Sequence, residues 1–476
     1  MSSVFENREP RRALELFGEL SAIPRSSGNE SGAADWLVAF AKKNGLECYR
    51  DAANNVLLRY IPEKAEAAPL LLQGHTDMVC VKETSSTHDF AHDPLELFVD
   101  ENGWLGARGT TLGADDGIGV TMALALLEEK PARVLECLFT TSEETGMDGA
   151  VAFDYSKITA RQMLNLDSED ENEAIVSCAG GCHLQISRRF ALQAASGSAL
   201  RVRVGGFAGG HSGSDIHLGK VNAARRLAKL LTKICEKYDC RLIGFVGGEK
   251  DNAIPTDACA ELLVGAGAET ELAELFKRAQ KTVTEVDAAA EISFERYDFS
   301  GNVYDTHATG QICKLIATIP NGVVSRYTHI DLVKTSLNTG VVRVADGDFL
   351  LHSMIRSSDD AEKDKLTEEV CALAAKMGFA YEKDGQYPSW GYAEQSPLRD
   401  TYLAAYRKVY GREPRVCGIH AGLECGFIKA AVPDMDILSL GPTMRDIHTV
   451  GERLDMDSCA RFMQMLRLIV HGHDAK

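Results

Sequence analysis

The sequence predicts an α/β protein into which a second, α+β domain is inserted. Three observations lead to this prediction. The chain has 476 residues, more than one compact core usually serves. Towards both ends, short aliphatic segments alternate with helical segments, as in a sheet with helices on its faces. Between these regions lie amphipathic strands and long amphipathic helices.

The first α/β region begins with helices and continues with strands. Residues 9–46 place apolar side chains at three- and four-residue intervals, and "PRSSGNES" indicates a turn and a helix N-cap between two helices. Aliphatic content predicts strands at residues 54–60, 69–77, 134–145 and 161–170. Residues 110–129 predict a glycine-rich turn that leads into a helix.

The central region has a different pattern. Amphipathic strands are predicted at residues 184–193, 198–207 and 258–265, and long helices at 220–238 and 359–379. "DGQYPSWGYAEQSPL", residues 384–398, indicates a linker back to a final α/β region. No sequence-level repeat is apparent. We therefore expect an α/β domain made of residues 1–183 and 391–476, with residues 184–390 as the insert.

Composition excludes several classes of partner. The formal net charge of -18 argues against nucleic acid and anionic membranes, because both require basic patches. Thirteen cysteines without a CxxC pair indicate reduced thiols and a cytoplasmic protein. Cys178 and Cys182 have helical spacing, but no second pair follows to complete a metal site. Neither a secretory signal nor a membrane span is expected, because long apolar stretches are absent from the sequence.

Three predicted strands end in polar residues that can carry chemistry. His75 and Asp77 follow "LLLQG", Glu143 and Glu144 follow "LFTTS", and Asp167 follows "MLNL". In an open α/β sheet, sites form outside the carboxyl ends of the strands, so we expect these side chains to converge. Strand periodicity places His75 and Asp77 on one side, where the aspartate can orient a metal-binding imidazole.

Asp115 and Asp116 lie in the glycine-rich turn "GTTLGADDGIG" before a helix. This is no phosphate loop, because the GK[ST] ending is missing and adjacent acids repel phosphate. The turn suits a cation better, although a helix N-cap explains an aspartate here equally well.

Each of these features has a plain structural alternative. A histidine at a strand end is commonly a hydrogen-bonded structural residue, a Glu-Glu pair is commonly a solvated turn, and Asp167 fits an acidic loop. Three acid-tipped strands, an acid-tipped turn and a late histidine together are harder to explain in this way. Histidines with several shared carboxylates form a ligand set that suits two Zn²⁺-like ions.

Five motifs in this order carry a family resemblance: "GHTDMV", "GTTLGADDGIG", "TSEETGMDGA", "NLDSED" and "RDIHTVGERLD". The chain resembles the M20 metallopeptidases over nearly its whole length. Within them it is most similar to the aminoacyl-histidine dipeptidases, the cytosolic non-specific dipeptidases of bacteria. "IPRSSGNESGAADWL", "GGHSGSDIHLGKVNA", "VKTSLNTGVV" and "IHAGLECG" belong to that branch. The resemblance implies a catalytic zinc-peptidase-type α/β domain with an inserted α+β lid and dimerisation domain.

The resemblance also implies roles for the acidic and histidine residues. His75 and Asp167 would bind one metal ion, Glu144 and His448 the other, and Asp115 would bridge both. Asp77 would orient His75, and Glu143 would be the general base. The peptide bond after Asp115 is cis in relatives, and we expect it between Asp115 and Asp116 here. Many M20 relatives have a lysine where this chain has Gly117, and the dipeptidase branch shares that change.

Further residues would bind the substrate. By resemblance, His211 in "GGHSG" donates to the developing oxyanion from the insert or its symmetry mate, although a turn residue between glycines is the plain alternative. Asn338 and Arg356 are candidates for the C-terminal carboxylate, and Arg356 fits an exposed strand cation equally well. The two remaining candidates, His420 and Glu424, would line the cleft of the α/β domain, with Glu424 facing the free amino group.

The function implied is hydrolysis of dipeptides with a free N-terminus, including Xaa-His and carnosine, by a metal-bridged hydroxide. The alternatives are an M20 deacylase or carboxypeptidase acting on N-acyl amino acids, and a non-catalytic amino acid or peptide carrier. A deacylase usually has an insert about half as long, and a carrier should have lost Glu143 or a ligand. We expect two divalent ions, zinc first with manganese or cobalt as alternatives, a small peptide as substrate, and a homodimer through the lid domain.

Overall fold

The computed structural model describes residues 4–265, 269–328 and 330–472, without the side chains of residues 269 and 270. The chain divides into two compact units. The α/β unit consists of Met1–Ser177, Tyr392–Gly418 and Leu423–Lys476, and the inserted unit of Cys178–Gly391 and Ile419–Gly422. The predicted α/β fold with an α+β insert is confirmed.

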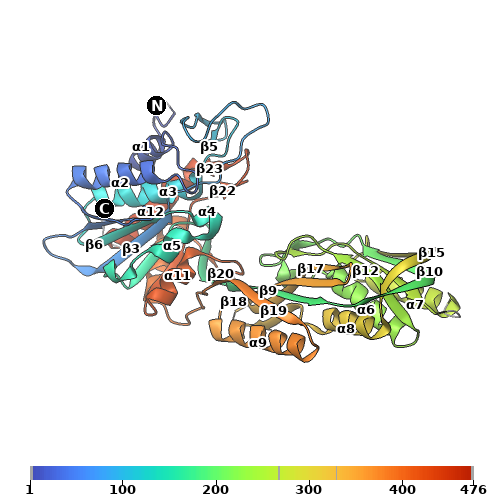
Figure 1. The fold of residues 1–476 in the computed structure, drawn as a ribbon. Helices are drawn as coiled ribbons and strands as arrows, with labels where there is room; N and C mark the ends of the chain where they lie inside the picture. Colours follow the sequence, from blue (N-terminus) through green and yellow to red (C-terminus); the bar gives the residue numbers. More distant parts are fainter. Residues whose placement is uncertain (1–3, 266–268, 329, 473–476) are drawn as a thin grey trace. The chain divides into compact units, whose positions relative to one another are not determined.

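The α/β unit is built on an eight-stranded sheet (Figure 1). The order is β1-β2-β6-β3-β7-β21-β8-β20, with bounds Glu47–Arg50, Val56–Tyr60, Arg133–Thr140, Ala67–His75, Gln162–Asn165, Asp436–Ser439, Glu173–Cys178 and Arg415–Ile419. The central strand β3 runs parallel to both neighbours, β6 and β7. Its apolar run Leu70–Leu72 is fully buried, which fixes the strand in the core. The carboxyl ends of β3, β6 and β7 therefore share one edge of the sheet.

Helices cover both faces of this sheet. Figure 1 shows α1, α2 and α3 on one side and α5 and α11 on the other. The helices of the unit are α1 Arg11–Leu20, α2 Ser31–Asn44, α3 Ala114–Glu128, α4 Glu143–Gly146, α5 Asp148–Ala152, α10 Pro397–Tyr410, α11 Glu424–Ala431 and α12 Met456–His471. Helix α3 packs on β3 and β6, and α1 and α12 pack on α3. A four-stranded sheet, β22-β23-β5-β4, consists of Met444–Arg445, Arg453–Asp455, Trp104–Ala107 and Leu97–Val99.

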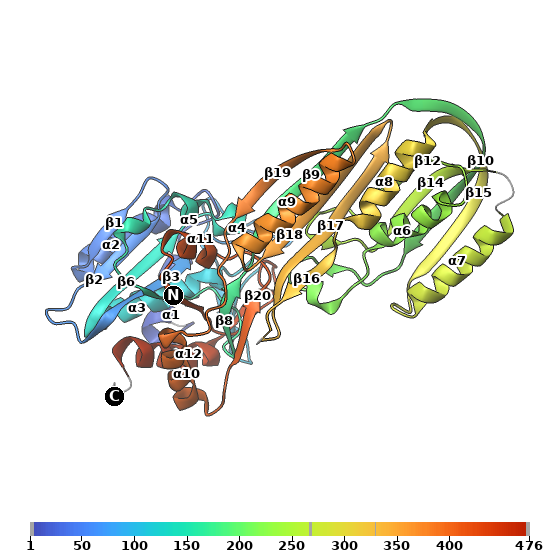
Figure 2. The ribbon, with the colours of Figure 1, turned by 90° about the horizontal axis from the view of Figure 1, so that it is seen from below.

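The inserted unit contains a nine-stranded antiparallel sheet with its helices on one side (Figure 2). The main path is β15-β10-β14-β12-β17-β18-β9-β19, with bounds Glu291–Tyr304, Leu192–Gly205, Ala258–Val264, Cys240–Gly247, Val333–Ala345, Asp348–Ser357, Gly180–Arg189 and Ala380–Tyr387. Strand β16, Gly322–Arg326, pairs with β17, and a separate ribbon joins β11, Gly210–His211, to β13, Ala253–Ile254. The helices are α6 Ala223–Cys235, α7 Glu269–Thr284, α8 Thr306–Thr318 and α9 Asp360–Lys376.

Two lobes of identical topology make up this sheet. The nested lobe, Leu192–Tyr304, runs β10-α6-β12-β14-α7-β15, and the flanking lobe runs β9-α8-β17-β18-α9-β19. In each lobe, if the strands are numbered along the chain, their order across the sheet is 4-1-3-2. The lobes join through their second strands, β12 and β17, and through the packing of α6 on α8. The nested lobe is thus inserted into the flanking lobe between its first strand and its first helix.

Details of the predicted domain boundaries differ from the structure. Strand β9 runs through the predicted boundary between residues 183 and 184 and lies wholly in the inserted unit. The predicted linker at 384–398 is wrong at its start, because β19 continues to Tyr387 and Trp390 forms a β-bridge with Cys178. Glycine and proline in this segment resemble a linker, but the backbone is paired.

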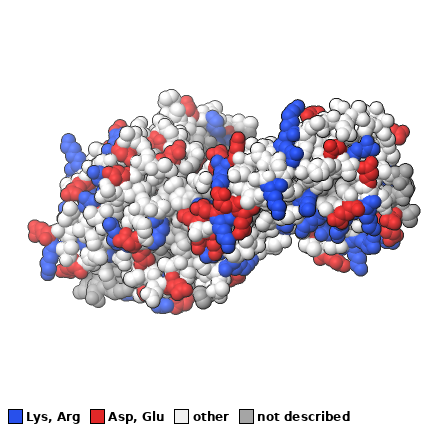
Figure 3. Space-filling model, turned by 60° about the horizontal axis from the view of Figure 1, so that its bottom comes forward, with Lys and Arg blue, Asp and Glu red and all other residues white. Residues whose placement is uncertain are grey.

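Figure 3 shows the charged side chains on one face of the molecule. On that face, acidic and basic side chains are interspersed. Among the described residues, no helix is both long and apolar enough to cross a membrane.

Candidate metal and substrate sites

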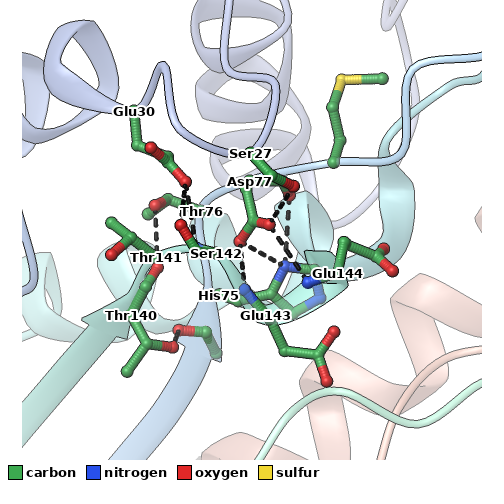
Figure 4. A network of polar contacts seen from close by, with 12 residues as sticks. Ser27, Glu30, His75, Thr76, Asp77, Thr140, Thr141, Ser142, Glu143 and Glu144 are labelled. Atoms are coloured by element: carbon green, nitrogen blue, oxygen red, sulfur yellow. Dashed lines mark hydrogen bonds and ion pairs between the residues drawn. The ribbon is translucent and has the colours of Figure 1, made fainter. Parts of the chain in front are cut away.

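Asp77 is the centre of a hydrogen-bond network at the end of β3 (Figure 4). It accepts bonds from Ser27 Oγ at 2.7 Å and from the backbone N–H groups of Glu143 at 3.1 Å and Glu144 at 3.2 Å. His75 Nδ1 lies 3.4 Å from Asp77 Oδ1. Burial opposes ionisation of Asp77, but the bonds from His75, Ser27 and Glu143 outweigh it and lower its pKa to about 2. Asp77 is therefore a fixed anion that orients His75 and the start of α4.

Arg25 and Glu452 hold the adjoining turn, and neither was singled out from the sequence. Arg25, fully buried, donates to the carbonyls of Thr76 and Asp77 at 3.0 Å and of Gly113 at 2.5 Å. Glu452 accepts the backbone N–H groups of four successive residues, 112 to 115, at 2.7, 2.9, 2.8 and 3.4 Å. Both residues bind main-chain atoms, and because every residue has these atoms, such contacts leave no pattern in the sequence. They fix the turn that presents Asp115.

Asp115 lies between two histidines. Its Oδ1 is 3.1 Å from His75 Nε2, and its Oδ2 is 3.1 Å from His448 Nε2. His448 comes from the loop between β22 and β23 with φ +61°, and its Nε2 is also 3.1 Å from Glu144 Oε1. Asp167, after β7, places Oδ1 3.5 Å from His75 Nε2. The structure thus brings together all five residues predicted to bind metal.

The backbone at Asp115 also matches the expectation. The Asp115–Asp116 peptide bond is cis, so that prediction is confirmed. Both residues have non-helical dihedral angles, so the regular part of α3 begins after them. Asp116 is fully buried, and a Cβ at Gly74 or Gly119 would lie 2.0 or 2.3 Å from its carboxylate oxygens. The two glycines therefore make room for this acid.

The cluster has more carboxylates than the protein itself neutralises. Burial raises the pKa of Asp167 and Asp116 well above the ordinary range, and neighbouring carboxylates add to the effect. Hydrogen bonds to Asp115 and Glu144 raise the pKa of His448 to about 10. Ligand atoms of His75, Asp115 and Glu144 lie within 4.8 Å of one another. Imidazole and carboxylate oxygens in this number fit divalent zinc-like ions, which would balance the charge.

Glu143 points away from Asp77 although its backbone is bound there (Figure 4). Burial raises the pKa of Glu143 to about 8, and the carboxylates of Glu424, Glu144 and Asp115 contribute. A carboxyl group whose pKa lies near neutrality is suited to accept and return a proton.

Glu424 lies deeper than expected for a residue that binds substrate. It is fully buried, and its Oε2 accepts from Gln73 Nε2 at 2.6 Å and Thr140 Oγ1 at 2.7 Å. Burial raises its pKa to about 7. Binding of an amino group stays a prediction, and the contacts favour a role in holding β3 beside β6.

Arg356, on β18 in the inserted unit, is a buried cation without an acidic partner. Only 6% of it is exposed, its Nη1 donates to Tyr387 Oη at 2.8 Å, and its Nε has no partner. Within the described part of the chain, no carboxylate forms an ion pair with it. Its charge lowers the pKa of His211 and His420, after the larger effect of burial. The alternative of an exposed strand cation is therefore wrong.

His211 is held in one tautomer. Its Nδ1 accepts from the backbone N–H groups of Gly213 at 3.2 Å and Ser214 at 3.1 Å. The proton of the neutral ring must then be on Nε2, which is free to donate. Gly213 is required in this loop, because a Cβ there would lie 2.4 Å from the His420 carbonyl oxygen.

His420 and Asn338 lie elsewhere than their predicted roles suggest. His420 belongs to the inserted unit, which corrects the expectation that it lines the α/β domain, and its Nε2 bonds Ser336 Oγ at 2.8 Å. Asn338, 1% exposed, donates to the carbonyls of Asp251 and Ala253, both at 2.8 Å. Both protons of its amide are used, so Asn338 fixes a loop of the nested lobe, and direct substrate contact stays a prediction.

A histidine–carboxylate cluster at the carboxyl edge of an α/β sheet is typical of metal-dependent hydrolases, the class that fold and site define. The chain belongs to peptidase family M20/M25/M40, whose family model matches residues 71–471. M20 peptidases are metal-dependent, in agreement with the cluster.

Individual relatives cover nearly the whole chain. The cytosol non-specific dipeptidase of Escherichia coli (strain K12) is 34% identical over 482 residues, which cover 98% of both chains. The crystal structure of aminoacylhistidine dipeptidase from Vibrio alginolyticus matches with a TM-score of 0.94 at 31% identity, over 98% of this chain and 99% of that one. Aminopeptidase PepT from Bacillus cereus shares the fold, with a TM-score of 0.56 at 16% identity over 98% of each chain.

Proposed function

We propose that this protein hydrolyses dipeptides with a free N-terminus, Xaa-His and β-Ala-His among them, with two divalent metal ions. The observation that carries the proposal is Asp115, whose two oxygens each lie 3.1 Å from a different histidine. That arrangement suits a carboxylate shared by two ions. The two similar dipeptidases named above support the choice of substrate.

The ligand assignment follows the contacts. His75 and Asp167 would hold one ion, Glu144 and His448 the other, and Asp115 both. Ions held there would lower the pKa of a water molecule and polarise the scissile carbonyl. Zinc is the proposed metal, and manganese or cobalt suits the same ligands. Asp77 keeps the His75 ring oriented through Nδ1.

The protein's own groups would move the protons. Glu143, with its pKa raised to about 8, takes a proton from the attacking water and returns it to the leaving amine. His211 donates from Nε2 to the oxygen that becomes negative, and its lowered pKa keeps the ring neutral.

Arg356 would select substrates by their C-terminal carboxylate. The inserted unit offers a buried guanidinium whose charge no described carboxylate neutralises, and guanidinium matches carboxylate in geometry. A short peptide with both ends free is the expected ligand. Asn338 and His420 of the inserted unit, and Glu424 of the α/β unit, are also proposed to bind substrate.

The proposal extends to the cell and the assembly. A cytoplasmic location is proposed, because the relative from Escherichia coli is named a cytosol dipeptidase. A homodimer through the inserted unit is also proposed. Strands β15 and β19 are the ends of its main sheet path and offer edges for pairing. Light scattering at micromolar concentration tests this, and a monomer would contradict it.

The test uses Ala-His, β-Ala-His, a tripeptide and N-acetyl-His with metal-loaded protein. Cleavage of the dipeptides only, lost on chelation and restored by Zn²⁺ or Mn²⁺, is expected. Cleavage of N-acetyl-His instead would assign the deacylase class, and no cleavage by protein that holds two ions would favour a carrier. Asp115→Asn should lose most of the bound metal, measured by elemental analysis, whereas the exposed change Asp364→Asn on α9 should not.

A further inference from the structure

Tyr387 lies beside Arg356 in a row of three residues on neighbouring strands. Arg356 on β18 pairs with Gly181 on β9, and Gly181 pairs with Tyr387 on β19. Because Gly181 has no side chain, the tyrosine ring lies over it, and a Cβ there would be 2.3 Å from Tyr387 Cζ. On another side, a Cβ at Gly422 would be 2.9 Å from Tyr387 Cε2. The ring is thus fixed by two glycines.

The bond between the two side chains determines which proton remains available. A guanidinium has donors only, so Arg356 Nη1 donates and Tyr387 Oη accepts at 2.8 Å. The phenol keeps its own proton, because burial raises its pKa. Among the described residues, nothing accepts this proton. Two donors, the guanidinium and the phenol O–H, are therefore held next to each other with no acceptor for the phenol and no counter-ion for the arginine.

We propose that Tyr387 binds the C-terminal carboxylate of the substrate together with Arg356, by donating its O–H proton to a carboxylate oxygen. This inference rests on the proposed function, which takes Arg356 as the carboxylate site. A carboxylate offers acceptors and a negative charge to both donors. A C-terminal amide offers one oxygen, no charge and an NH₂ group that faces two donors. Tyr387 thereby distinguishes a free C-terminus from a blocked one.

The experiment compares Tyr387→Phe with Tyr381→Phe in the full-length, metal-loaded protein. Tyr381 lies on the same strand and is 41% exposed, so it is a matched control. Calorimetry measures binding of Ala-His and Ala-His amide in a Glu143→Gln background, and kinetics measure KM and kcat with Glu143 intact. Loss of a hydrogen bond to a charged group should reduce the preference for the free acid about tenfold or more. KM for Ala-His should rise by the same factor, with kcat unchanged.

Each result decides one question. If Tyr387→Phe weakens the binding of Ala-His and of Ala-His amide equally, or lowers kcat alone, the tyrosine has only a structural role and the inference is overturned. An unchanged preference, or no preference in the parent protein, would also overturn it. If the parent cleaves no peptide but prefers the acid, and Tyr387→Phe abolishes that preference, the proposed function fails and the inference stands.

Discussion

The α/β unit and the inserted unit each contain a buried charged cluster, and the two are unbalanced in opposite senses. Around Asp115, carboxylates outnumber the two histidines, and burial raises the pKa of Asp167 and Glu143. Around Arg356, burial and the arginine charge lower the pKa of His211 and His420, and Tyr387 accepts a hydrogen bond from the guanidinium. The nearby carboxylate of Asp251 is paired with His183, whose pKa it raises. A folded protein tolerates unpaired buried charge poorly, so the first cluster is suited to cations and the second to an anion.

The nested lobe provides a balanced reference for the second cluster. Its third, first and fourth strands carry Glu261, Arg201 and Glu295 in one cross-strand row. In the flanking lobe the equivalent strands carry Arg356, Gly181 and Tyr387. Arg201 is paired with both glutamates, at 2.5 Å to Glu261, and needs no ligand. Two lobes of one topology thus use the same kind of row for different purposes.

The largest effect is expected in the acidic cluster. Glu143→Gln keeps the shape of the side chain but removes the proton acceptor, so kcat should fall about 10³-fold while bound metal is unchanged. Steady-state kinetics and elemental analysis measure the two quantities. Glu101→Gln, an exposed change in the turn between β4 and β5, should alter neither kcat nor the bound metal. Activity of Glu143→Gln within tenfold of the parent would refute the general-base assignment.

A smaller loss is expected in the cationic cluster. Arg356→Met removes the charge and its hydrogen bonds, so kcat/KM for Ala-His should fall about 100-fold or more, mainly through KM. Arg201→Met removes an arginine of the balanced row and should leave both constants unchanged. Equal kinetic effects of the two variants would show that the comparison between the rows is mistaken.

The packing of the row itself gives a smaller effect. Gly181→Ala places a Cβ 2.3 Å from Tyr387 and 2.5 Å from Met354 Cε, so the ring must move. The preference for free acid over amide should fall up to tenfold, and the free energy of unfolding by about 1–3 kcal/mol. Denaturant titration measures the latter. Gly310→Ala on α8, where nothing lies within 4 Å of the added Cβ, should not destabilise.

A separate effect concerns stability and depends on pH. The pKa of Glu424 is raised to about 7 in the folded protein, so its contribution is complete below its ordinary pKa, near 4.5, and is lost as pH rises through 7. Relative to Glu424→Gln, the parent should lose on the order of 3 kcal/mol between pH 4.5 and 8. Denaturant titrations at both pH values test this, and a pH-independent difference would contradict it.

His420 should show the opposite dependence. Burial, followed by the charge of Arg356, lowers its pKa to about 3. Its contribution is therefore complete above pH 6.5 and is lost as pH falls through 3. Two buried residues four positions apart, one in each unit, thus destabilise the protein at opposite ends of the pH range.

The convergence of the histidines and carboxylates at one sheet edge is predictable from the sequence because its parts are strongly patterned. Apolar runs such as Leu70–Leu72 predict buried strands, and parallel strands that end in acids must bring those acids to one edge. The roles of Arg25 and Glu452 could not be predicted from the sequence, because both residues bind backbone atoms that only folding brings near them. The glycine and proline around Tyr387 predict a linker there, although the backbone of Tyr387 pairs with β9.

The repeated lobe could not be predicted either. Topology is defined by which strands pair, and many sequences satisfy the same pairing. Only the half-apolar alternation is shared, and that pattern is common to most antiparallel strands. His420 was misplaced for a related reason, because four residues of the inserted unit interrupt a segment of the α/β unit.

The nested insertion also sets the order in which the protein can assemble during synthesis. The nested lobe is continuous, so all its strands are available once Tyr304 has left the ribosome. Strand β9 can pair with β18 and β19 only after these are made, more than 150 residues later. The pairing of β7 with β21 is likewise delayed until β21 is made. His448 is the last of the five proposed ligands to be made. A nascent chain therefore has all strands of the inserted unit's sheet once Tyr387 is made, before it contains all five proposed ligands.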